Sequence, residues 1–458
     1  MCFQLRASFP RSSASAPTLA PARRAVKRPR SNRYASVMEV TAADIAADTV
    51  RAKSAARAMA AAPTGVKNRA LEAIARGLGE SVDGILAANA SDLADERAQG
   101  LSRALTDRLT LTPERVEAMA AGVREVAALD DPVGEVLESG TLENGLELSK
   151  IRVPLGVVAV VYEARPNVTI DCAALTIKSG NSILLKGSSY AENTNLALAE
   201  VVRSGLAEAG LPEDGVVMSV GGGRESIADL ATQDGVVDLL IPRGGEGLKK
   251  TLEEVATVPV IFAAAGICHV YVHSDANLEM ARAIAYNAKI QRPGVCNAAE
   301  TLLVDSAVAA AFLPPALAEL SGGGVELVGD ESTRENAGDT PVGEATEVDW
   351  DTEYLDLKLA VKVVDGLDEA IEHINRHGSG HSDAIVTDNA QAADLFAQGV
   401  DSAAVYVNAS TRFTDGFEFG MGAEIGVSTQ KLHARGPVGL KELTTTKYVG
   451  RGDGQVRG

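Results

Sequence analysis

The chain has 458 residues, enough for two or three domains, and its composition of 46% hydrophobic and 23% charged residues is that of a globular protein. Its formal net charge of −19 argues against a nucleic acid partner, because phosphate binding requires a basic face. The four cysteines are too scattered for a disulfide framework, which favours a reducing cytoplasm, and no apolar run reaches the length of a membrane span.

Residues 1–37 differ from the rest of the chain, being rich in Arg, Ser, Ala and Pro and free of Asp and Glu. A transit peptide has this composition, and so does an upstream stretch translated ahead of the true start. We favour the second interpretation, in which the protein begins at Met38. Under either interpretation we expect the segment to be disordered and to contribute nothing to the fold.

Residues 41–129 are predicted to be helical, because stretches such as VKNRALEAIARGLGESVDGILAAN repeat apolar residues at spacings of three and four. One helix should take Thr112 as its N-cap, with Pro at its first position. Segment 141–156 alternates instead around Asn144-Gly145, which predicts a β-hairpin. A protruding hairpin has exposed edges, so we expect it to pair with a partner.

The chain then alternates between continuous apolar stretches and amphipathic ones, which predicts parallel strands covered by helices on both faces. Such a doubly wound α/β sheet binds ligands at the carboxyl ends of its strands. The expected strands are 157–162, 182–186, 216–220, 237–241 and 259–263.

A second α/β unit is expected beyond residue 266. Its predicted strands lie in CHVYVH, ETLLVD, AVKVVD and DAIVTDN, with helices over 277–290 and 367–375. The acidic segment 331–351 has no regular pattern, so we expect a surface excursion there.

Two glycine-containing turns follow predicted strands of the first unit. One runs from Gly221 to Gly223, and the other is Arg243-Gly244-Gly245, which opens a helix. Backbone N–H groups at such turns can face a phosphate or a nicotinamide, although glycines also occur there for conformational reasons alone. Two such turns at one end of a sheet favour a dinucleotide crevice, even though no G-x-G-x-x-G fingerprint follows the first strand.

Three polar residues have both a functional and a bland interpretation. Lys186 ends a strand and is as readily solvated as functional, and Asn167 is either a turn residue or an amide donor for an oxyanion. Cys296, in the stretch QRPGVCNAAETLLV, is either a buried filler or a nucleophile. No spacing indicates a metal site, since glycines separate His377 from His381 in a loop.

Several long motifs together resemble the gamma-glutamyl phosphate reductases, also called glutamate 5-semialdehyde dehydrogenases, within the aldehyde dehydrogenase superfamily. The resemblance runs in order from about Met38 to Gly450. The motifs are VPLGVVAVVYEARPNVT, ILLKGSS, IPRGGEGL, RPGVCNAAETLLV, TEYLDLKLAVKVV, HGSGHSDAIVT and FEFGMGAEIGVSTQKLHARGPVGLKELTTTKYV. The fold it implies has two doubly wound parallel-sheet domains and a small β oligomerisation hairpin.

By this resemblance Cys296 is the catalytic thiol, and Asn167 helps to form the oxyanion hole. Lys186 and Glu353 are expected near the ribose portions of the cofactor, and 242–247 near the nicotinamide. The implied divisions are a cofactor domain over 38–265 with the hairpin 139–156 inserted, a catalytic thiol domain over 266–435, a C-terminal oligomerisation strand over 436–450 that pairs with the hairpin, and a tail over 451–458.

The implied activity is the NADPH-dependent reduction of L-glutamyl 5-phosphate to L-glutamate 5-semialdehyde and phosphate through a cysteinyl thioester, the second step of proline biosynthesis from glutamate. A homo-oligomer is expected, and the upstream glutamate kinase is a candidate partner. The thiolate should be favoured by its surroundings, since a free Cys has a pKa of about 8.5. Arg292 either helps the thiolate or anchors the substrate, and Asn297 is a further candidate for substrate binding.

NADP is expected rather than NAD. In NAD-preferring relatives a carboxylate often lies three residues after the cofactor lysine, where it would repel a 2′-phosphate. Here Lys186 is followed by Gly187, Ser188 and Ser189, so the position is neutral and offers a hydroxyl. The alternative is that the two serines serve only to form the loop.

The sequence also departs from related families. Hydrolytic aldehyde dehydrogenases carry a general-base Glu before a Gly-Gly pair, whereas alanine precedes Gly266 here, which argues against hydrolysis. Ile267 stands where the closer family has Asn, which places a local contact in doubt. A CoA-acylating dehydrogenase and a non-catalytic dinucleotide-binding protein remain as competing interpretations. An assay with free CoA tests the former, and the presence of the Cys, Asn and Lys argues against the latter.

Overall fold

The computed structural model describes residues 42–101, 103–163, 165–262 and 265–457. The expectation for 1–37 lies outside these residues. Contacts group 38–458 into one compact unit, to which the following description applies. No helix in the described ranges is long and apolar enough to cross a membrane.

The N-terminal region is helical, as predicted. The Thr112 hydroxyl accepts a hydrogen bond from the Arg115 N–H at 3.2 Å, which confirms the N-cap. The helices are α1 (Ala42–Ala60), α2 (Thr64–Glu80), α3 (Val82–Ala94), α4 (Arg103–Leu109) and α5 (Pro113–Ala128), with the short turn η1 (Ala98–Gly100) between α3 and α4.

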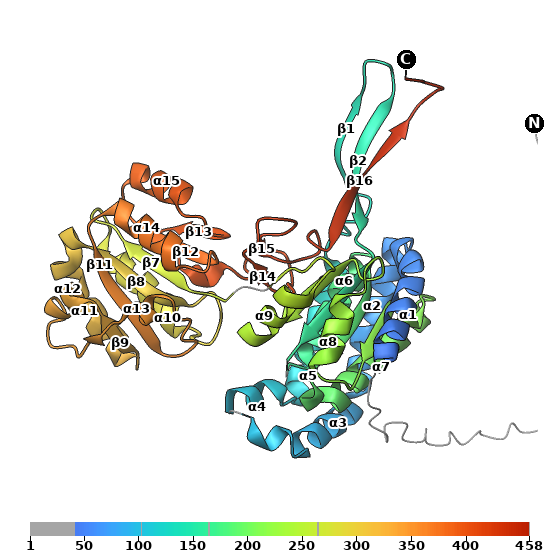
Figure 1. The fold of residues 1–458 in the computed structure, drawn as a ribbon, viewed down its shortest axis with the longest axis horizontal. Helices are drawn as coiled ribbons and strands as arrows, with labels where there is room; N and C mark the ends of the chain where they lie inside the picture. The colour runs from blue at the N-terminus through green and yellow to red at the C-terminus, as the bar shows by residue number, and fades with distance from the viewer. Residues whose placement is uncertain (1–41, 102, 164, 263–264, 458) are drawn as a thin grey trace, which may run out of the picture. The chain divides into compact units, whose positions relative to one another are not determined.

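A four-stranded parallel sheet in the order β5-β4-β3-β6 forms the centre of the first α/β unit (Figure 1). Its strands are β3 (Val157–Tyr162), β4 (Ser182–Gly187), β5 (Val216–Ser219) and β6 (Leu239–Arg243). The connecting elements are α6 (Asn167–Lys178), η2 (Ser189–Ala191), α7 (Glu192–Glu208), η3 (Glu213–Gly215), α8 (Arg224–Ala231) and α9 (Glu246–Val255).

Every residue of β3 is buried, because both faces of this sheet are covered. Val158 and Val160 face the core shared with α2, α5, α6 and α7, whereas Val157 and Ala159 face the core shared with α1, α8 and α9. This alternation along a strand is what a doubly wound sheet requires. The loops that follow β3, β4, β5 and β6 therefore meet at one edge of the sheet.

The fifth strand predicted at 259–263 is wrong. Only Val260 forms a bridge, to Leu240, within the described part of that stretch. Pro259 precedes it, and proline has no N–H with which to extend a ladder.

The second α/β unit is a seven-stranded sheet in the order β10-β9-β11-β8-β7-β12-β13, with all neighbours parallel. Its strands are β7 (Cys268–Val272), β8 (Ala299–Asp305), β9 (Glu326–Gly329), β10 (Gly343–Glu344), β11 (Lys358–Val364), β12 (Ser382–Val386) and β13 (Ala404–Val407). Its helices are α10 (Leu278–Ile290), α11 (Ser306–Gly322), α12 (Glu331–Glu335), α13 (Glu347–Trp350), α14 (Leu367–His377) and α15 (Ala390–Gly399), followed by the turn η4 (Thr411–Phe413).

The acidic segment 331–351 is not the irregular excursion that we expected. It contains α12, β10 and α13, and β10 extends the sheet by pairing with β9. Trp350, at the end of α13, is only 6% exposed and packs against Val328 and Ala360. This buried contact holds α13 against the sheet.

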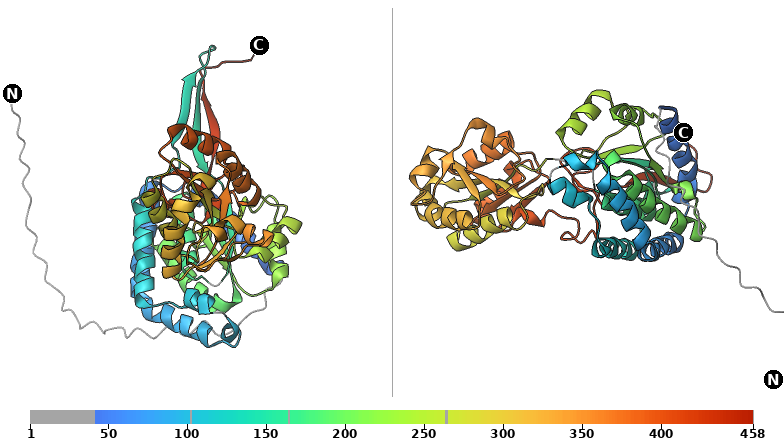
Figure 2. Two further views of the ribbon diagram at one scale, coloured as in Figure 1. Left: turned by 90° about the vertical axis from the view of Figure 1, so that its left-hand side faces the viewer. Right: turned by 90° about the horizontal axis from the view of Figure 1, so that it is seen from below.

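A separate three-stranded sheet contains β1 (Val136–Thr141), β2 (Glu147–Pro154) and β16 (Thr444–Arg451). Its hairpin turns at Asn144 and Gly145, whose φ of 83° suits glycine, and it begins three residues before the predicted start at 139. Strand β16 pairs antiparallel with β2 along its whole length, so the predicted pairing of the C-terminal strand is confirmed. Figure 2 shows these strands projecting beyond the helices of the first unit.

The small strands β14 (Val427–Ser428) and β15 (Gly436–Pro437) pair with each other.

Candidate active site

Cys296 lies in the loop 291–298, between α10 and β8, and is partly exposed. Gly266 approaches the backbone of this residue so closely that a Cβ there would overlap the Cys296 carbonyl. The Cys268 thiol, buried in β7, donates to the same carbonyl at 3.2 Å. Glycine at 266 thus lets the β7 segment pass directly behind the thiol loop.

The turn η4 and the residue after it are hydrogen-bonded to the same loop. The Asn297 amide donates to the carbonyls of Arg412 at 3.3 Å and Thr414 at 2.9 Å, and the Thr411 hydroxyl donates to the Asn297 carbonyl at 2.7 Å. Asn297 is only 4% exposed, and its Oδ1 has no partner in the described part of the chain. The structure therefore gives its amide nitrogen a structural role, which differs from the expected contact with substrate.

The charges around Cys296 do not produce a ready thiolate. Burial, helped by the carboxylates of Glu424 and Glu353, raises the pKa of this thiol to about 11, while the Arg243 guanidinium opposes the rise. Our expectation of a favoured thiolate is wrong for this state, because desolvation outweighs the opposing Arg243 charge and a backbone hydrogen bond to the thiol. The opposing cation is Arg243 rather than Arg292, whose side chain is exposed.

Asn167 is the first residue of α6, just beyond the carboxyl end of β3. Its amide donates to the Asp171 carboxylate at 2.9 Å, which leaves the second amide hydrogen available. Burial raises the pKa of Asp171 to about 6, and this hydrogen bond and the Arg243 charge oppose that rise. Asn167 is therefore held in place by Asp171, while its role as an oxyanion donor stays a prediction.

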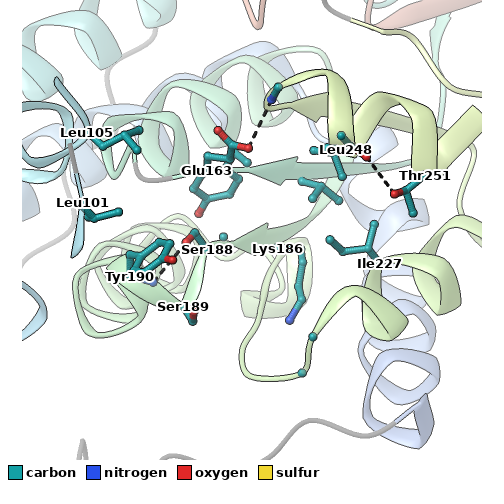
Figure 3. Close-up of a pocket in the computed structure, with 17 residues that line it drawn as sticks. Leu101, Leu105, Glu163, Lys186, Ser188, Ser189, Tyr190, Ile227, Leu248 and Thr251 are labelled. Atoms are coloured by element: carbon teal, nitrogen blue, oxygen red, sulfur yellow. Dashed lines mark hydrogen bonds between the residues drawn. The ribbon is translucent and has the colours of Figure 1, made fainter. Parts of the chain in front are cut away.

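A cavity of about 520 Å³ opens at the edge where the strands of the four-stranded sheet end (Figure 3). Apolar side chains form two of its walls, Leu101 and Leu105 at one end and Ile227 and Leu248 at the other. An apolar pocket with a few placed polar groups is typical of a cofactor site. The predicted cofactor residues that line it are Lys186, Ser188, Ser189 and Gly245, joined by Gly222 and Gly223.

Lys186 is 5% exposed, and its ammonium donates to the carbonyl of Gly221. Burial lowers the pKa of Lys186, although the carboxylates of Glu192 and Asp48 oppose this. Gly221 and Gly222 have φ of 70° and 69°, which only glycine adopts readily, so the turn that holds this carbonyl needs both residues. A buried ammonium with a neutral acceptor suits an anionic ligand such as a cofactor phosphate.

The second glycine turn, which follows β6, is hydrogen-bonded to the residue that follows β3. The N–H of Gly245 donates to the Glu163 carboxylate at 3.3 Å, and a Cβ at Gly244 would lie 2.9 Å from the same side chain. Arg243 is the last residue of β6, and its positive charge lowers the pKa of Cys296. The predicted 243–245 turn thus contributes Gly245 to the cavity lining and the Arg243 charge to the surroundings of the thiol.

Glu353 does not line the cavity around Lys186. Its carboxylate accepts from the N–H of Gly266 at 2.7 Å, beside the Cys296 loop. The structure groups Glu353 with the thiol and groups Lys186 with the cavity, so the two predicted ribose contacts lie at different places in the site. Both roles stay predictions.

Sequence reasoning missed three charged residues around the thiol: Arg165, Arg412 and Glu424. Burial lowers the pKa of both arginines, that of Arg165 to about 10, and the interaction with Cys296 opposes this fall. Burial raises the pKa of Glu424 to about 7, and its Oε2 has no partner among the described residues. Each of these residues stands inside a motif quoted above or beside one, but no local pattern marks it as facing Cys296.

Comparisons with known proteins agree with this architecture. The Aldehyde dehydrogenase family matches residues 20–340. Gamma-glutamyl phosphate reductase of Thermobifida fusca is 56% identical over 407 residues, which cover 89% of this chain and 97% of that protein. The crystal structure of gamma-glutamyl phosphate reductase from Thermotoga maritima has 46% identity and a TM-score of 0.88, covering 90% of this chain and all of that one. An acetylating aldehyde dehydrogenase from Geobacillus thermoglucosidasius is 17% identical with a TM-score of 0.66 over 91% of this chain and 98% of its own, which shows the fold alone.

Proposed function

This chain belongs to the aldehyde dehydrogenase family and, within it, to the gamma-glutamyl phosphate reductases, and we propose that it reduces L-glutamyl 5-phosphate to L-glutamate 5-semialdehyde and phosphate. This is the second step of proline biosynthesis from glutamate. The observation that carries the proposal is the position of Cys296, which Gly266 and η4 hold in a loop flanked by Arg243 and Arg412. A thiol held among cations suits attack on an anionic acyl phosphate.

The first half of the reaction transfers the acyl group to Cys296. The sulfur forms a bond to the acyl carbon, and the carbon–oxygen bond to phosphate breaks with its electron pair. Because burial raises the pKa of the thiol to about 11, Cys296 holds its proton at neutral pH. The thiol proton passes to a phosphate oxygen of the substrate as the sulfur adds to the acyl carbon, and the group then departs as hydrogen phosphate.

Membership of this family implies a nicotinamide cofactor, which when bound supplies a hydride to the thioester carbon. The residues fit such a group, since the cavity offers apolar walls, a buried ammonium at Lys186 and two glycine turns. After reduction the carbon–sulfur bond breaks, the aldehyde leaves, and the Cys296 thiolate takes a proton from solvent. Asn167 is the proposed amide donor to the oxyanion at each tetrahedral stage, a contact whose loss typically costs about 2.7–4 kcal/mol.

NADP is the cofactor that the cavity favours in this proposal. The Ser188 hydroxyl is engaged within the loop, because it accepts a hydrogen bond from the Tyr190 N–H at 3.2 Å and caps η2. Ser189 lines the cavity, is exposed, and occupies the neutral position three residues after Lys186. A 2′-phosphate carries close to two negative charges, which the Lys186 ammonium attracts and a carboxylate at position 189 would repel.

The sheet formed by β1, β2 and β16 is the proposed surface for homo-oligomer formation. All six residues of β1 are exposed, and β1 is an edge strand whose outer backbone groups are free to pair. Apolar side chains also remain in solvent on this sheet, with Val136 57%, Leu142 45% and Tyr448 63% exposed. An exposed apolar edge of this kind is typical of a protein–protein interface.

A coupled assay tests the activity. The purified chain is mixed with glutamate 5-semialdehyde, inorganic phosphate and NADP, and the absorbance of reduced nicotinamide is followed. We expect turnover that requires phosphate and disappears in Cys296→Ser, while that variant keeps its fold and cofactor binding. Turnover with CoA in place of phosphate, or full activity in the serine variant, would contradict the proposal.

A further inference from the structure

Arg412 is fixed relative to the thiol loop at two points on either side of Cys296. Its Nε donates to the Gln291 side chain at 2.9 Å, and its carbonyl accepts from the Asn297 amide at 3.3 Å. Gln291 and Asn297 are the first residue of that loop and the one that follows Cys296. The position of this guanidinium beside the thiol is therefore set by the loop itself.

The guanidinium of Arg412 has no carboxylate partner within ion-pair distance in the described part of the chain. Its terminal nitrogens, Nη1 and Nη2, likewise have no hydrogen-bond acceptor there, since only Nε is engaged. Burial and the nearby Arg292 charge lower its pKa, whereas Asp415 and the Cys296 thiol raise it. A half-buried cation with two free donors is costly unless an anion binds it, and the planar fork of Arg suits a phosphate or a carboxylate.

The other two cations beside the thiol, Arg243 and Arg165, make no side-chain hydrogen bond to the thiol loop among the described residues, and carboxylates influence both. Arg243 opposes the raised pKa values of Asp171 and Glu424, so carboxylates already face its charge. Arg165 is influenced by the Glu163 carboxylate as well as by two further arginines. Among the described residues, Arg412 is thus the cation near Cys296 that hydrogen bonds hold to the thiol loop on both sides of the thiol, while its two terminal nitrogens are left for an incoming anion.

We propose that Arg412 binds the phosphoryl group of the acyl phosphate during attack by Cys296, and binds inorganic phosphate in the reverse reaction. The inference rests on the proposed function for its substrate. The phosphate is attached directly to the acyl carbon that Cys296 attacks, whereas the substrate's α-carboxylate is four carbon–carbon bonds away. A guanidinium held at the thiol loop therefore meets the phosphate and, as the carbon–oxygen bond breaks, stabilises the charge that collects on the leaving oxygen.

Arg412→Gln tests this in the reverse direction, with Arg282→Gln as the matched control. Arg282 lies in the same α/β unit, is partly exposed as Arg412 is, and pairs with Glu319 at 3.2 Å. We expect the KM for phosphate to rise on the order of tenfold or more in Arg412→Gln, because a charge-assisted hydrogen bond is lost. The KM for the semialdehyde should stay within about twofold in both variants. A selective rise in the semialdehyde KM would assign Arg412 to the α-carboxylate and overturn the proposal.

A second readout does not depend on turnover. Iodoacetamide alkylation of Cys296 is followed by mass spectrometry at about pH 9, with and without inorganic phosphate. Phosphate should slow the reaction in the wild type and in Arg282→Gln but not in Arg412→Gln. Phosphate protection that persists in Arg412→Gln, or is absent from the wild type, would refute the inference. If the wild type shows protection but no turnover of semialdehyde, the proposed function fails and the phosphate site stands.

Circular dichroism checks whether Arg412→Gln folds. If it does not, Arg412→Lys provides a second test. Lysine keeps the charge but lacks the fork that reaches both Gln291 and an anion. Its KM for phosphate should lie between those of the wild type and the glutamine variant. An unchanged KM for phosphate in the lysine variant, together with unchanged protection, would also count against the inference.

Discussion

The Lys289 ammonium lies 2.6 Å from the Glu300 carboxylate, and both side chains are at most 1% exposed. Lys289 belongs to the last turn of α10 and Glu300 to the start of β8, so the pair closes the base of the loop that carries Cys296. The second oxygen of Glu300 accepts from the Leu355 N–H at 3.1 Å, which ties in the segment that carries Glu353. A buried ion pair thus fastens both ends of the thiol loop and a neighbouring segment.

Lys289→Met should destabilise the protein by about 3–5 kcal/mol at neutral pH, because it leaves a buried carboxylate without its partner. Urea unfolding followed by circular dichroism measures the loss. The double variant Lys289→Met with Glu300→Leu removes both charges and should recover most of the stability. A single variant as stable as the wild type would show that the pair does not hold the loop.

Gly266→Ala should lower kcat by about a hundredfold, because the new Cβ overlaps the Cys296 carbonyl and must displace the thiol. Gly294→Ala is the comparison within the same loop, since its Cβ would meet only the Leu355 carbonyl at 3.6 Å, an ordinary contact. The kcat of this second variant should fall much less. Equal losses in the two variants would mean that the close approach of Gly266 is unimportant.

Alkylation of Cys296 should accelerate with pH up to about 11, the pKa to which burial raises this thiol. The charges around the thiol determine the direction in which two substitutions should shift the midpoint of this pH dependence. Arg243→Gln removes the cation that favours the thiolate and should move the midpoint up, whereas Glu424→Gln removes a carboxylate that disfavours the thiolate and should move it down. Iodoacetamide rates across pH measure both, and shifts in the same direction would contradict the arrangement of charges.

Ser189→Glu should weaken NADP much more than NAD, because a carboxylate at this position repels the 2′-phosphate and accepts from a ribose hydroxyl. Ser189→Ala serves as the control, and loss of one neutral hydrogen bond worth about 0.5–1.5 kcal/mol should reduce NADP use only moderately. The measurement is kcat/KM for both cofactors in each variant. If the ratio of kcat/KM for NADP to kcat/KM for NAD is unchanged in Ser189→Glu, the proposed contact between position 189 and the 2′-phosphate is wrong.

Val136→Lys combined with Tyr448→Lys should weaken the proposed oligomer, because both apolar side chains are more than half exposed on the three-stranded sheet. Sedimentation at micromolar concentration should show an oligomer for the wild type and a smaller species for the variant. Val348→Lys is the control, since Val348 is 72% exposed but lies on α13. A monomeric wild type would contradict the proposed role of the hairpin.

The sequence by itself determined the local elements. Strand β3 has the predicted bounds because a short run of six apolar residues, most of them β-branched, favours a strand covered on both faces. The hairpin turn and the N-cap at Thr112 were likewise predictable, since Asn144-Gly145 and Thr-Pro specify their own backbone geometry. The long motifs also indicated the family, and with it came the prediction that Cys296 is the nucleophile.

Only the tertiary structure decided the environment of Cys296. Arg412 reaches the thiol loop through a hydrogen bond between residues 115 positions apart, which no local spacing encodes. The pKa of Cys296 depends on how much solvent the surrounding chain excludes, and that burial reversed the expectation of a ready thiolate. Periodicity and turn chemistry act over a few residues, whereas desolvation and convergent charge arise only when distant segments pack together.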